Sequence, residues 1–260
     1  AVELGLFTTL GSKSMTADKL QDVLGLHRRA VPDFFDALVA LRFLDREGDG
    51  PQALYRNTEE TRLFLDRNSP EYMGGFLDMA NARLYRFWGD LTEGLRTGKP
   101  QNEIKHTGEP VFKALYSDPK RLEQFVNAMS GISADNFHAF AQKFDFSRYH
   151  TLCDIGGATG QLSMIAAKRH PHLRCTTVDL PVVTPIAERK IAEAGLSDRV
   201  SAKSVDIFAE PLPQADVITM GMILHDWNLE KKMQLIRAVY DALPPGGAFV
   251  VIENLIDDAR

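Results

Sequence analysis

The sequence has few cysteines, no long apolar run and no strong excess of charge of one sign. Its two cysteines, Cys153 and Cys175, lie in predicted strands, so we expect buried free thiols in a reducing compartment such as the cytoplasm rather than a disulfide framework. No apolar run approaches the ~20 residues of a membrane span, and the N-terminal residues lack the pattern of a secretion signal. The formal net charge of −5 favours neither nucleic acid nor an anionic membrane as a partner.

The chain length and composition are those of an ordinary globular protein. Its 260 residues can bury a sizeable core and favour two domains, and 44% of them are hydrophobic. Both ends are abrupt. Ala1 lies inside an apolar pattern without an initiating methionine, and Arg260 directly follows a strand-like run. We therefore expect the sequence to be part of a longer protein.

The most informative stretch is Thr151–Gly160, TLCDIGGATG. Its apolar start predicts a short buried parallel strand, and the residues from Gln161 to His170 predict a helix. Gly156, Gly157 and Gly160 lie between the two. A strand, a glycine turn and a helix in this order are typical of a nucleotide-type loop, in which the bare backbone allows a ligand to approach closely.

From residue 151 onward, short apolar runs alternate with helical patterns. We expect strands at 151–155, 174–178, 199–205, 215–220 and 247–253, and helices near 160–169, 184–194 and 229–242. This alternation predicts a doubly wound parallel α/β sheet. Because such sheets bind ligands beyond the carboxyl ends of their strands, the residues that follow each strand are the candidate site.

The N-terminal part predicts two helices and a hairpin. Helices are expected at Thr16–Leu24, with Thr16 as the cap, and at Val31–Phe43, and the glycines and proline of Leu44–Tyr55 predict a hairpin. This arrangement resembles a winged-helix module, which raises DNA binding as an alternative function. Arg28 and Arg29 lie near the start of the reading helix, but Asp33 and Asp36 follow them, so a packing or dimerisation surface is the favoured interpretation.

Residues 58–146 are mostly helical by pattern and rich in aromatic side chains. Aromatic residues at helical spacing usually form a core, although some could line a pocket for a flat apolar ligand.

Polar residues follow four of the five predicted strands in the C-terminal part. Asp179 follows the second strand, where a carboxylate can accept both hydroxyls of a ribose; the alternative is a turn before Pro181. Asp206 follows the third strand, and Ile207 beside it could contact a purine; the alternative is a loop or cap acid. His225 follows the fourth strand and Glu253 the fifth, with a helix-entry residue and a surface acid as their alternatives.

The glycine loop argues against a phosphate ligand and leaves a nicotinamide dinucleotide as a poorly fitting alternative. GGATGQ has neither the lysine nor the serine or threonine that a phosphate-binding P-loop needs, and its glycine spacing fits the dinucleotide pattern poorly. The remaining histidines show no metal-ligand spacing, so we assign no metal.

Five motifs together resemble a known family. DIGGATG, VDLP, VDIF, LHDW and PPGGAFVVIEN, in this order, are similar to motifs of the plant-type small-molecule O-methyltransferases that use S-adenosylmethionine, which include caffeate and acetylserotonin O-methyltransferases and bacterial natural-product enzymes. The resemblance implies a class I methyltransferase Rossmann-like sheet preceded by an α-rich winged-helix dimerisation domain. The expected parts are a dimerisation domain at 1–60, a helical connector contributing to the substrate pocket at 61–146 and the cofactor domain at 147–260.

The resemblance also implies a role for each matching residue. Gly156 and Ser133 would lie near the methionine part of the cofactor, Asp179 would bind the ribose, Asp206, Ile207 and Trp227 would hold the adenine, Met129 would flank the substrate, His225 would be the general base and Glu253 would orient it. The expected partners are a hydroxylated aromatic or polyketide-like small molecule and a second copy of the chain, with no nucleic acid and no membrane. Neutral histidine suits the base because it is populated at pH 7.

Three departures from the family pattern affect these expectations. Ala158 replaces the usual third glycine of the loop, and Gly221 and Met222 stand where a lysine or arginine is usual. Further sheet strands and a second carboxylate supporting the histidine would lie beyond Arg260. Nitrogen or carbon methylation, or a family member that does not transfer a methyl group, remain alternatives alongside the DNA-binding regulator.

Overall fold

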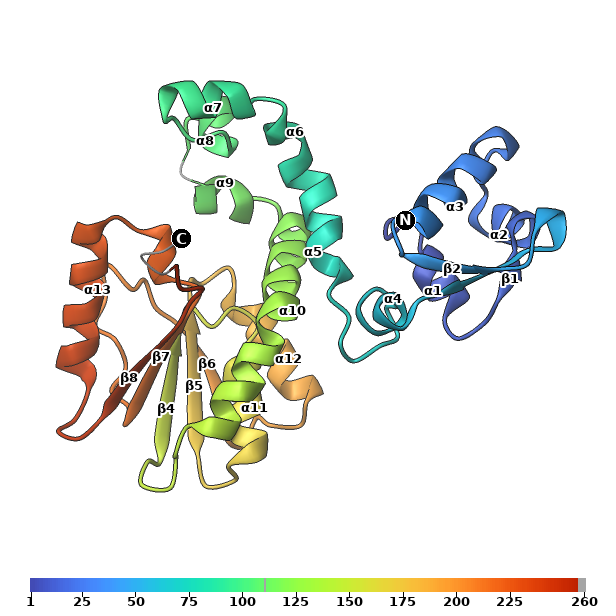
Figure 1. The fold of residues 1–260 in the computed structure, drawn as a ribbon. Coiled ribbons are helices and arrows are strands. Elements are labelled where there is room, and N and C mark those ends of the chain that lie inside the picture. Colours follow the sequence, from blue (N-terminus) through green and yellow to red (C-terminus); the bar gives the residue numbers. More distant parts are fainter. Residues whose placement is uncertain (110, 257–260) are drawn as a thin grey trace. The chain divides into compact units, whose positions relative to one another are not determined.

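A computed structural model describes residues 1–109 and 111–256 and divides the chain into two compact units, Ala1–Leu115 and Tyr116–Arg260. The first unit is mainly helical with a small sheet, and the second contains the larger sheet (Figure 1). The finer division into parts at 1–60, 61–146 and 147–260 stays a prediction.

The first unit begins with the predicted order of two helices and a hairpin. Its elements are α1 (Leu6–Leu10), β1 (Met15–Thr16), α2 (Ala17–Leu24), η1 (Arg28–Ala30), α3 (Val31–Ala40), β2 (Leu44–Glu47), η2 (Gly50–Gln52) and β3 (Leu54–Asn57). The strands form an antiparallel sheet in the order β1-β3-β2. Thr16 caps α2 as predicted, because its hydroxyl accepts a hydrogen bond from the Lys19 amide at 3.3 Å.

The second predicted helix ends earlier than expected. α3 ends at Ala40 rather than at Phe43, because Arg42 takes a left-handed φ of 61° and the Phe43 amide donates back to the Leu38 carbonyl at 2.8 Å. The prediction was wrong here since apolar periodicity continues past the point where the backbone turns.

The remainder of the first unit is helical, as predicted for residues 58–146. Its elements are α4 (Glu59–Phe64), α5 (Gly74–Met79), the π-helical η3 (Ala80–Leu84), α6 (Tyr85–Trp88), α7 (Leu91–Thr97), α8 (Glu103–Thr107) and α9 (Val111–Tyr116), which reaches the boundary.

The second unit contains a parallel sheet of five strands in the order β6-β5-β4-β7-β8. Its elements are α10 (Pro119–Lys143), β4 (Thr151–Ile155), α11 (Gln161–Arg169), β5 (Arg174–Asp179), α12 (Thr184–Glu193), β6 (Val200–Ser204), β7 (Val217–Gly221), η4 (Leu224–Asp226), α13 (Leu229–Ala242) and β8 (Ala248–Ile252). All five predicted strands and the three predicted helices that connect them are confirmed. The strand order reverses at β4, which is where ligands bind in sheets of this kind.

Apolar side chains on both faces of the sheet hold the helices in place. Leu152 packs with α11 and α12 on one face, and Cys153, the next residue of β4, packs with α13 on the other. Helices α10, α11 and α12 therefore lie on one side of the sheet and α13 on the other (Figure 1). Cys153 and Cys175 are buried free thiols, as expected.

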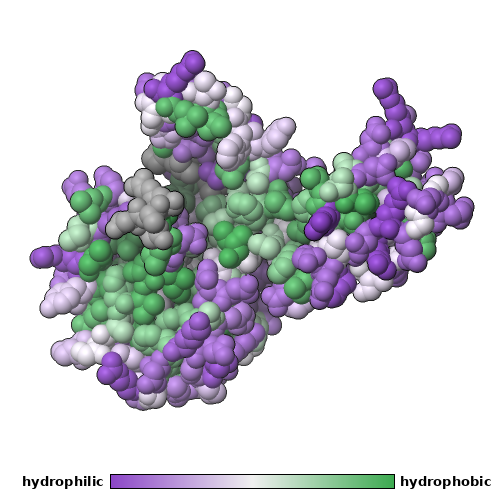
Figure 2. Space-filling model, in the orientation of Figure 1, coloured by the Kyte–Doolittle hydropathy of each residue, from purple (hydrophilic) through white to green (hydrophobic). Residues whose placement is uncertain are grey.

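The edge of the sheet at β8 carries an apolar surface (Figure 2). Val251 of β8 is 40% exposed, and an exposed stripe on α13 is formed by Leu229, Met233, Ile236 and Tyr240. Such a surface is typical of a region that another segment or molecule covers. Within the described part of the chain, no helix is long and apolar enough to cross a membrane.

Candidate active site

The glycine loop follows β4 and is pinned to the neighbouring strand. The amides of Gly156 and Gly157 donate to the carbonyl of Val178 at 2.8 and 3.2 Å. Gly156 has a φ of 67°, which glycine adopts at no steric cost. Ala158 also lies in the left-handed region, with a φ of 47°, and a residue with a side chain pays about 1 kcal/mol or more there. The alanine is thus accommodated at the loop but at a cost in backbone strain.

Gly157 is required by the packing of the protein itself. A Cβ at this position would lie 2.0 Å from Thr177 Oγ1 and 2.6 Å from Asp154 Oδ2. Both side chains come from buried strand positions and have little freedom to move. The backbone at Gly157 therefore lies directly against the end of the sheet.

Asp179 ends β5 with its carboxylate fixed by two backbone amides. Its Oδ2 accepts from the Ala158 amide at 3.0 Å and its Oδ1 from the Leu180 amide at 2.8 Å. Burial raises the pKa of this carboxyl, and the two amide hydrogen bonds partly oppose that rise. Each carboxylate oxygen retains a further lone pair, so the two oxygens can still accept hydrogen bonds from two adjacent hydroxyls.

Asp206 lies beside Asp179 because the Val205 amide donates to the Asp179 carbonyl at 2.9 Å. Its Oδ1 accepts a hydrogen bond from the Phe208 amide at 3.0 Å. This bond stabilises the turn, which is the role of the loop or cap acid given above as the alternative for Asp206. The Asp206 amide in turn donates to Glu210 Oε1 at 2.9 Å. This turn holds the segment that follows β6 against the end of β5.

An apolar wall adjoins Asp206. Ile207, Phe208 and Trp227 pack against the same core cluster, and the rings of Phe208 and Trp227 meet edge to face with centroids 4.6 Å apart. Lys231 Nζ lies 4.1 Å from the centroid of the Phe208 ring. A cation thus reaches this wall from α13, whereas Gly221 and Met222 stand at the positions before the histidine where the family usually has a lysine or arginine.

His225 and Glu253 form a hydrogen-bonded pair across the ends of β7 and β8. The Glu253 Oε1 accepts from the amides of Ile223 and Leu224 at 3.0 and 2.9 Å, and its Oε2 lies 2.6 Å from His225 Nδ1. The Glu253 side chain is only 12% exposed, whereas that of His225 is 49% exposed. A carboxylate can only accept, so Nδ1 carries the proton and Nε2 of the neutral ring has the free lone pair.

Asp226 lies close to the His225 ring, and Met222 holds the backbone just before it. Asp226 Oδ1 lies 3.4 Å from His225 Nε2, and burial raises the pKa of the Asp226 carboxyl. Met222, just before this segment, has a left-handed φ of 58° and donates to the Ile252 carbonyl at 2.9 Å. Backbone strain of this kind is found where the surrounding structure fixes a segment firmly. Asn228 caps α13 by accepting a hydrogen bond from the Lys231 amide at 3.0 Å.

Helix α10 carries the two remaining predicted residues, Met129 and Ser133. They lie one helical turn apart, with Met129 half-buried and Ser133 buried. The direct contact with the glycine loop comes from another residue: Ser130 Oγ lies 2.7 Å from Thr159 Oγ1. Ser130 could not be identified from the sequence, because a serine in a helix does not indicate which loop it faces.

Tyr116 is a further residue that the sequence did not single out. Its ring packs in an apolar cluster with Ala158 and Leu180. Burial, together with the negative charges of Asp179 and Asp226, raises the pKa of its phenol. The phenol is therefore close to carboxylates at both the glycine-loop end and the histidine end of the site.

Asp154 lies behind the glycine loop in a buried polar row. It shares its register with Thr177 of β5 and Thr219 of β7, and Thr219 Oγ1 donates to Asp154 Oδ1 at 2.8 Å. Burial is the main cause that raises the pKa of Asp154 to about 7. Thr177 Oγ1 is buried without a hydrogen-bond partner, and a protonated Asp154 could supply one.

Replacing Asp154 by asparagine is expected to flatten the pH dependence of stability. The pKa in the folded state, about 7, is raised above the ordinary 3.8, so the stabilisation from this carboxyl is full below about pH 4 and is lost as the pH rises through 7. This loss corresponds to at most about 4 kcal/mol, and asparagine does not titrate. Urea unfolding of both proteins from pH 5 to 8 measures the free energy of unfolding. As the pH rises, this free energy should fall in the wild type but not in the variant; parallel pH profiles would contradict the assignment.

Among the described residues, no cluster of histidine, cysteine or acidic side chains could hold a metal ion.

Comparison with known proteins gives two family models that together match most of the chain. An O-methyltransferase domain matches residues 88–260, and an O-methyltransferase dimerisation domain matches residues 1–67. These matches agree with the parallel sheet of the second unit and the helical first unit.

Relatives and solved structures match over the whole chain. Tetracenomycin polyketide synthesis 8-O-methyl transferase TcmO of Streptomyces glaucescens is 39% identical over 100% of this chain and 75% of its own length. The N,N-dimethyltransferase OxyT of Streptomyces rimosus is 36% identical over 100% of this chain and 74% of its own length. The crystal structure of human N-acetylserotonin methyltransferase in complex with S-adenosylmethionine superposes with a TM-score of 0.91 at 29% identity, covering 100% of this chain and 76% of that one.

Proposed function

The chain belongs to the family of S-adenosylmethionine-dependent O-methyltransferases, and from this we propose that it methylates a hydroxyl of an aromatic or polyketide-like small molecule, with His225 as the general base. The observation that supports the base is the 2.6 Å contact between His225 Nδ1 and Glu253, which makes Nε2 the acceptor nitrogen of the neutral ring. The name of TcmO, a polyketide 8-O-methyl transferase, supports the acceptor class.

The residues at the strand ends fit the cofactor chemically. Asp179 keeps one lone pair on each carboxylate oxygen after accepting two backbone amides, which suits the two hydroxyls of a ribose. Asp206 with Ile207 and Trp227 offers a polar acceptor beside an apolar wall, which suits an adenine. We assign Gly156 and Ser133 to the methionine end.

In the proposed mechanism the protein mainly aligns the reactants and moves one proton. When bound, the cofactor supplies a methyl group on a sulfonium that is already activated for displacement. Nε2 of His225 takes the proton of the acceptor hydroxyl as that oxygen attacks. Glu253 fixes the tautomer through Nδ1 and stabilises the positive ring, in the manner of the aspartate in a serine-hydrolase triad. Asp226, 3.4 Å from Nε2, adds a second negative charge beside the protonated ring.

The histidine–glutamate pair favours oxygen over nitrogen as the acceptor. A phenol must lose its proton to become a strong nucleophile, whereas a neutral amine already presents a lone pair and needs no base before attack. Nitrogen remains the second candidate because OxyT is by name an N,N-dimethyltransferase.

A matched pair of acceptors tests the proposal. The protein is incubated with methyl-labelled S-adenosylmethionine and either 1-naphthol or 1-naphthylamine, and the same is done with a hydroxylated anthraquinone and its amino analogue. Label is expected in the methyl ether, identified by the chemical shift of its methoxy carbon. Transfer to the amines alone, or to neither acceptor while the cofactor binds, would overturn the proposal.

We also propose that the chain forms a homodimer through its N-terminal unit. The match to a dimerisation domain over residues 1–67 supports this. Within that range the exposed apolar side chains are Leu4, Val23, Leu41, Phe43 and Leu54. Exposed apolar residues of this number in a small unit are suited to a protein interface.

A further inference from the structure

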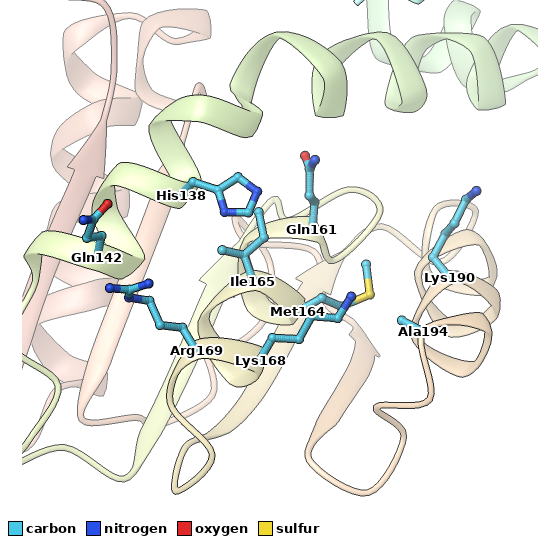
Figure 3. A pocket seen from close by; sticks show the side chains of 9 residues that line it. All are labelled: His138, Gln142, Gln161, Met164, Ile165, Lys168, Arg169, Lys190 and Ala194. Carbon is cyan, nitrogen blue, oxygen red and sulfur yellow. The ribbon is translucent and has the colours of Figure 1, made fainter. Parts of the chain in front are cut away.

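A hollow of about 520 Å³ lies on the side of α11 that faces α10 and α12 rather than the sheet (Figure 3). Its lining comes from α10 (His138, Gln142), α11 (Gln161, Met164, Ile165, Lys168, Arg169) and the end of α12 and just beyond it (Lys190, Ala194). Arg169 lies on the side of α10 and Lys190 on the side of α12, with Gln161 and Met164 between them (Figure 3). The volume is that of an ordinary small-ligand site.

The lining is strongly positive in a chain that is negative overall. It contains Lys168, Arg169 and Lys190 and no carboxylate, although the formal net charge of the chain is −5. Within the described part of the chain, neither Lys168 nor Arg169 has a carboxylate within 4.0 Å. Lys190 Nζ is 3.8 Å from Glu193 Oε2, an exposed pair that contributes little. Two cations therefore face the hollow without an ion-pair partner.

The other lining groups add hydrogen bonding and an apolar floor. The His138 imidazole and the Gln142 and Gln161 amides can donate hydrogen bonds. Gln161 has a buried amide oxygen without a hydrogen-bond partner, and turning the amide would present its N–H groups instead. Met164, Ile165 and Ala194 supply carbon surface. The combination suits an anion that carries an apolar body.

We propose that this hollow is a binding site for a small phosphorylated anion. Three cations match a phosphate dianion with its three terminal oxygens better than a carboxylate, which carries one charge on two oxygens. The guanidinium of Arg169 has the planar fork that binds phosphate oxygens in pairs. The hollow adjoins the candidate active site at Gln161, which directly follows the glycine loop, and its other lining residues lie further along α11 and on or just beyond α10 and α12.

Calorimetric titration with pyrophosphate tests the charge requirement. The wild type is titrated at low salt in the presence of saturating S-adenosylhomocysteine, so that the cofactor cleft is filled. The double variant Lys168→Gln/Arg169→Gln is expected to bind at least about tenfold more weakly, because it loses two charge-assisted hydrogen bonds to the anion. The matched control Lys232→Gln/Arg237→Gln changes the same residue types on α13 and is expected to bind as the wild type.

Two outcomes would overturn the proposal: equal pyrophosphate affinity in wild type and Lys168→Gln/Arg169→Gln, or an equal loss in the α13 control. Melting temperatures of both variants separate a folding defect from a loss of binding. A nuclear magnetic resonance titration adds a readout of place, since pyrophosphate should shift the Met164 methyl signal in the wild type and not in Lys168→Gln/Arg169→Gln. A shift equal in both proteins would also contradict the assignment.

A second pair of probes distinguishes the source of the phosphate. Phenyl phosphate is expected to bind more tightly than inorganic phosphate if Met164 and Ile165 contact an organic body, and equally if the natural ligand is inorganic. In both cases the Lys168→Gln/Arg169→Gln variant must bind the phosphate compound more weakly. Such a loss shows that the compound binds in the hollow and not in the site of the methyl acceptor.

Discussion

Replacing His225 by alanine is expected to lower kcat by about 100- to 10,000-fold while leaving cofactor affinity nearly unchanged. Alanine removes the imidazole that Glu253 orients through Nδ1, so the acceptor hydroxyl loses Nε2 as its positioned base. The main anchors proposed for the cofactor, Asp179 and Asp206, are held by their own backbone hydrogen bonds and do not depend on His225. Single-turnover kinetics and calorimetric titration with S-adenosylhomocysteine measure the two effects separately.

The control for this prediction is His150→Ala. His150 is also exposed, but it directly precedes β4. It therefore lies at the amino ends of the parallel strands, opposite to the candidate active site. Its removal should leave kcat unchanged. If His225→Ala turns over as the wild type does, His225 is not the base; if cofactor affinity falls in parallel with kcat, its role is in binding.

The parallel sheet could be predicted because its signals are local. Each strand of the second unit is a short apolar run, and each connecting helix has its own period, so the elements are visible without knowledge of their partners. The position of Asp179, His225 and Glu253 at one edge then follows from topology, because parallel strands end together. In the first unit, Arg42 shows where prediction from apolar periodicity fails, because its left-handed φ ends α3 inside a continuing apolar pattern.

The contacts across the site could not be predicted because they depend on the approach of distant segments. Ser130 meets Thr159 only because α10 passes the glycine loop, and Lys231 covers Phe208 only because α13 packs beside the turn after β6. Neither residue type identifies its partner from sequence. The burial of Asp154, which raises its pKa, likewise depends on the two neighbouring strands and the loop above it.

Glu253 connects the fold to the proposed chemistry. One of its oxygens accepts the amides of Ile223 and Leu224 and so fixes the start of η4, while the other contacts His225. The same carboxylate therefore sets both the backbone that carries the ring and the orientation of the ring. A surface acid at a strand end would do neither, and its 12% exposure argues against that alternative.

Replacing Gly157 by alanine is expected to weaken cofactor binding by about 10- to 100-fold. The new Cβ would lie 2.0 Å from Thr177 Oγ1, so the loop must move away from the sheet. Forcing an extra carbon into a packed site costs about 1–3 kcal/mol, which corresponds to roughly 5- to 150-fold in affinity if the strain falls on the bound geometry. The Ala158 amide, which holds Asp179, would move with the loop. Titration with S-adenosylhomocysteine measures the loss.

The double variant Gly157→Ala/Thr177→Ala distinguishes steric pressure from a direct role of Gly157. Thr177 Oγ1 is buried and makes no hydrogen bond to the glycine loop, so Thr177→Ala alone leaves the hydrogen bonds of the loop intact and should bind the cofactor as the wild type does. In the double variant the closest clash is gone and Asp154 Oδ2 at 2.6 Å remains, so we expect partial recovery. Unchanged affinity in Gly157→Ala would show that the loop does not need this close approach. No recovery in the double variant would mean that the clash with Asp154, rather than with Thr177, controls the position of the loop.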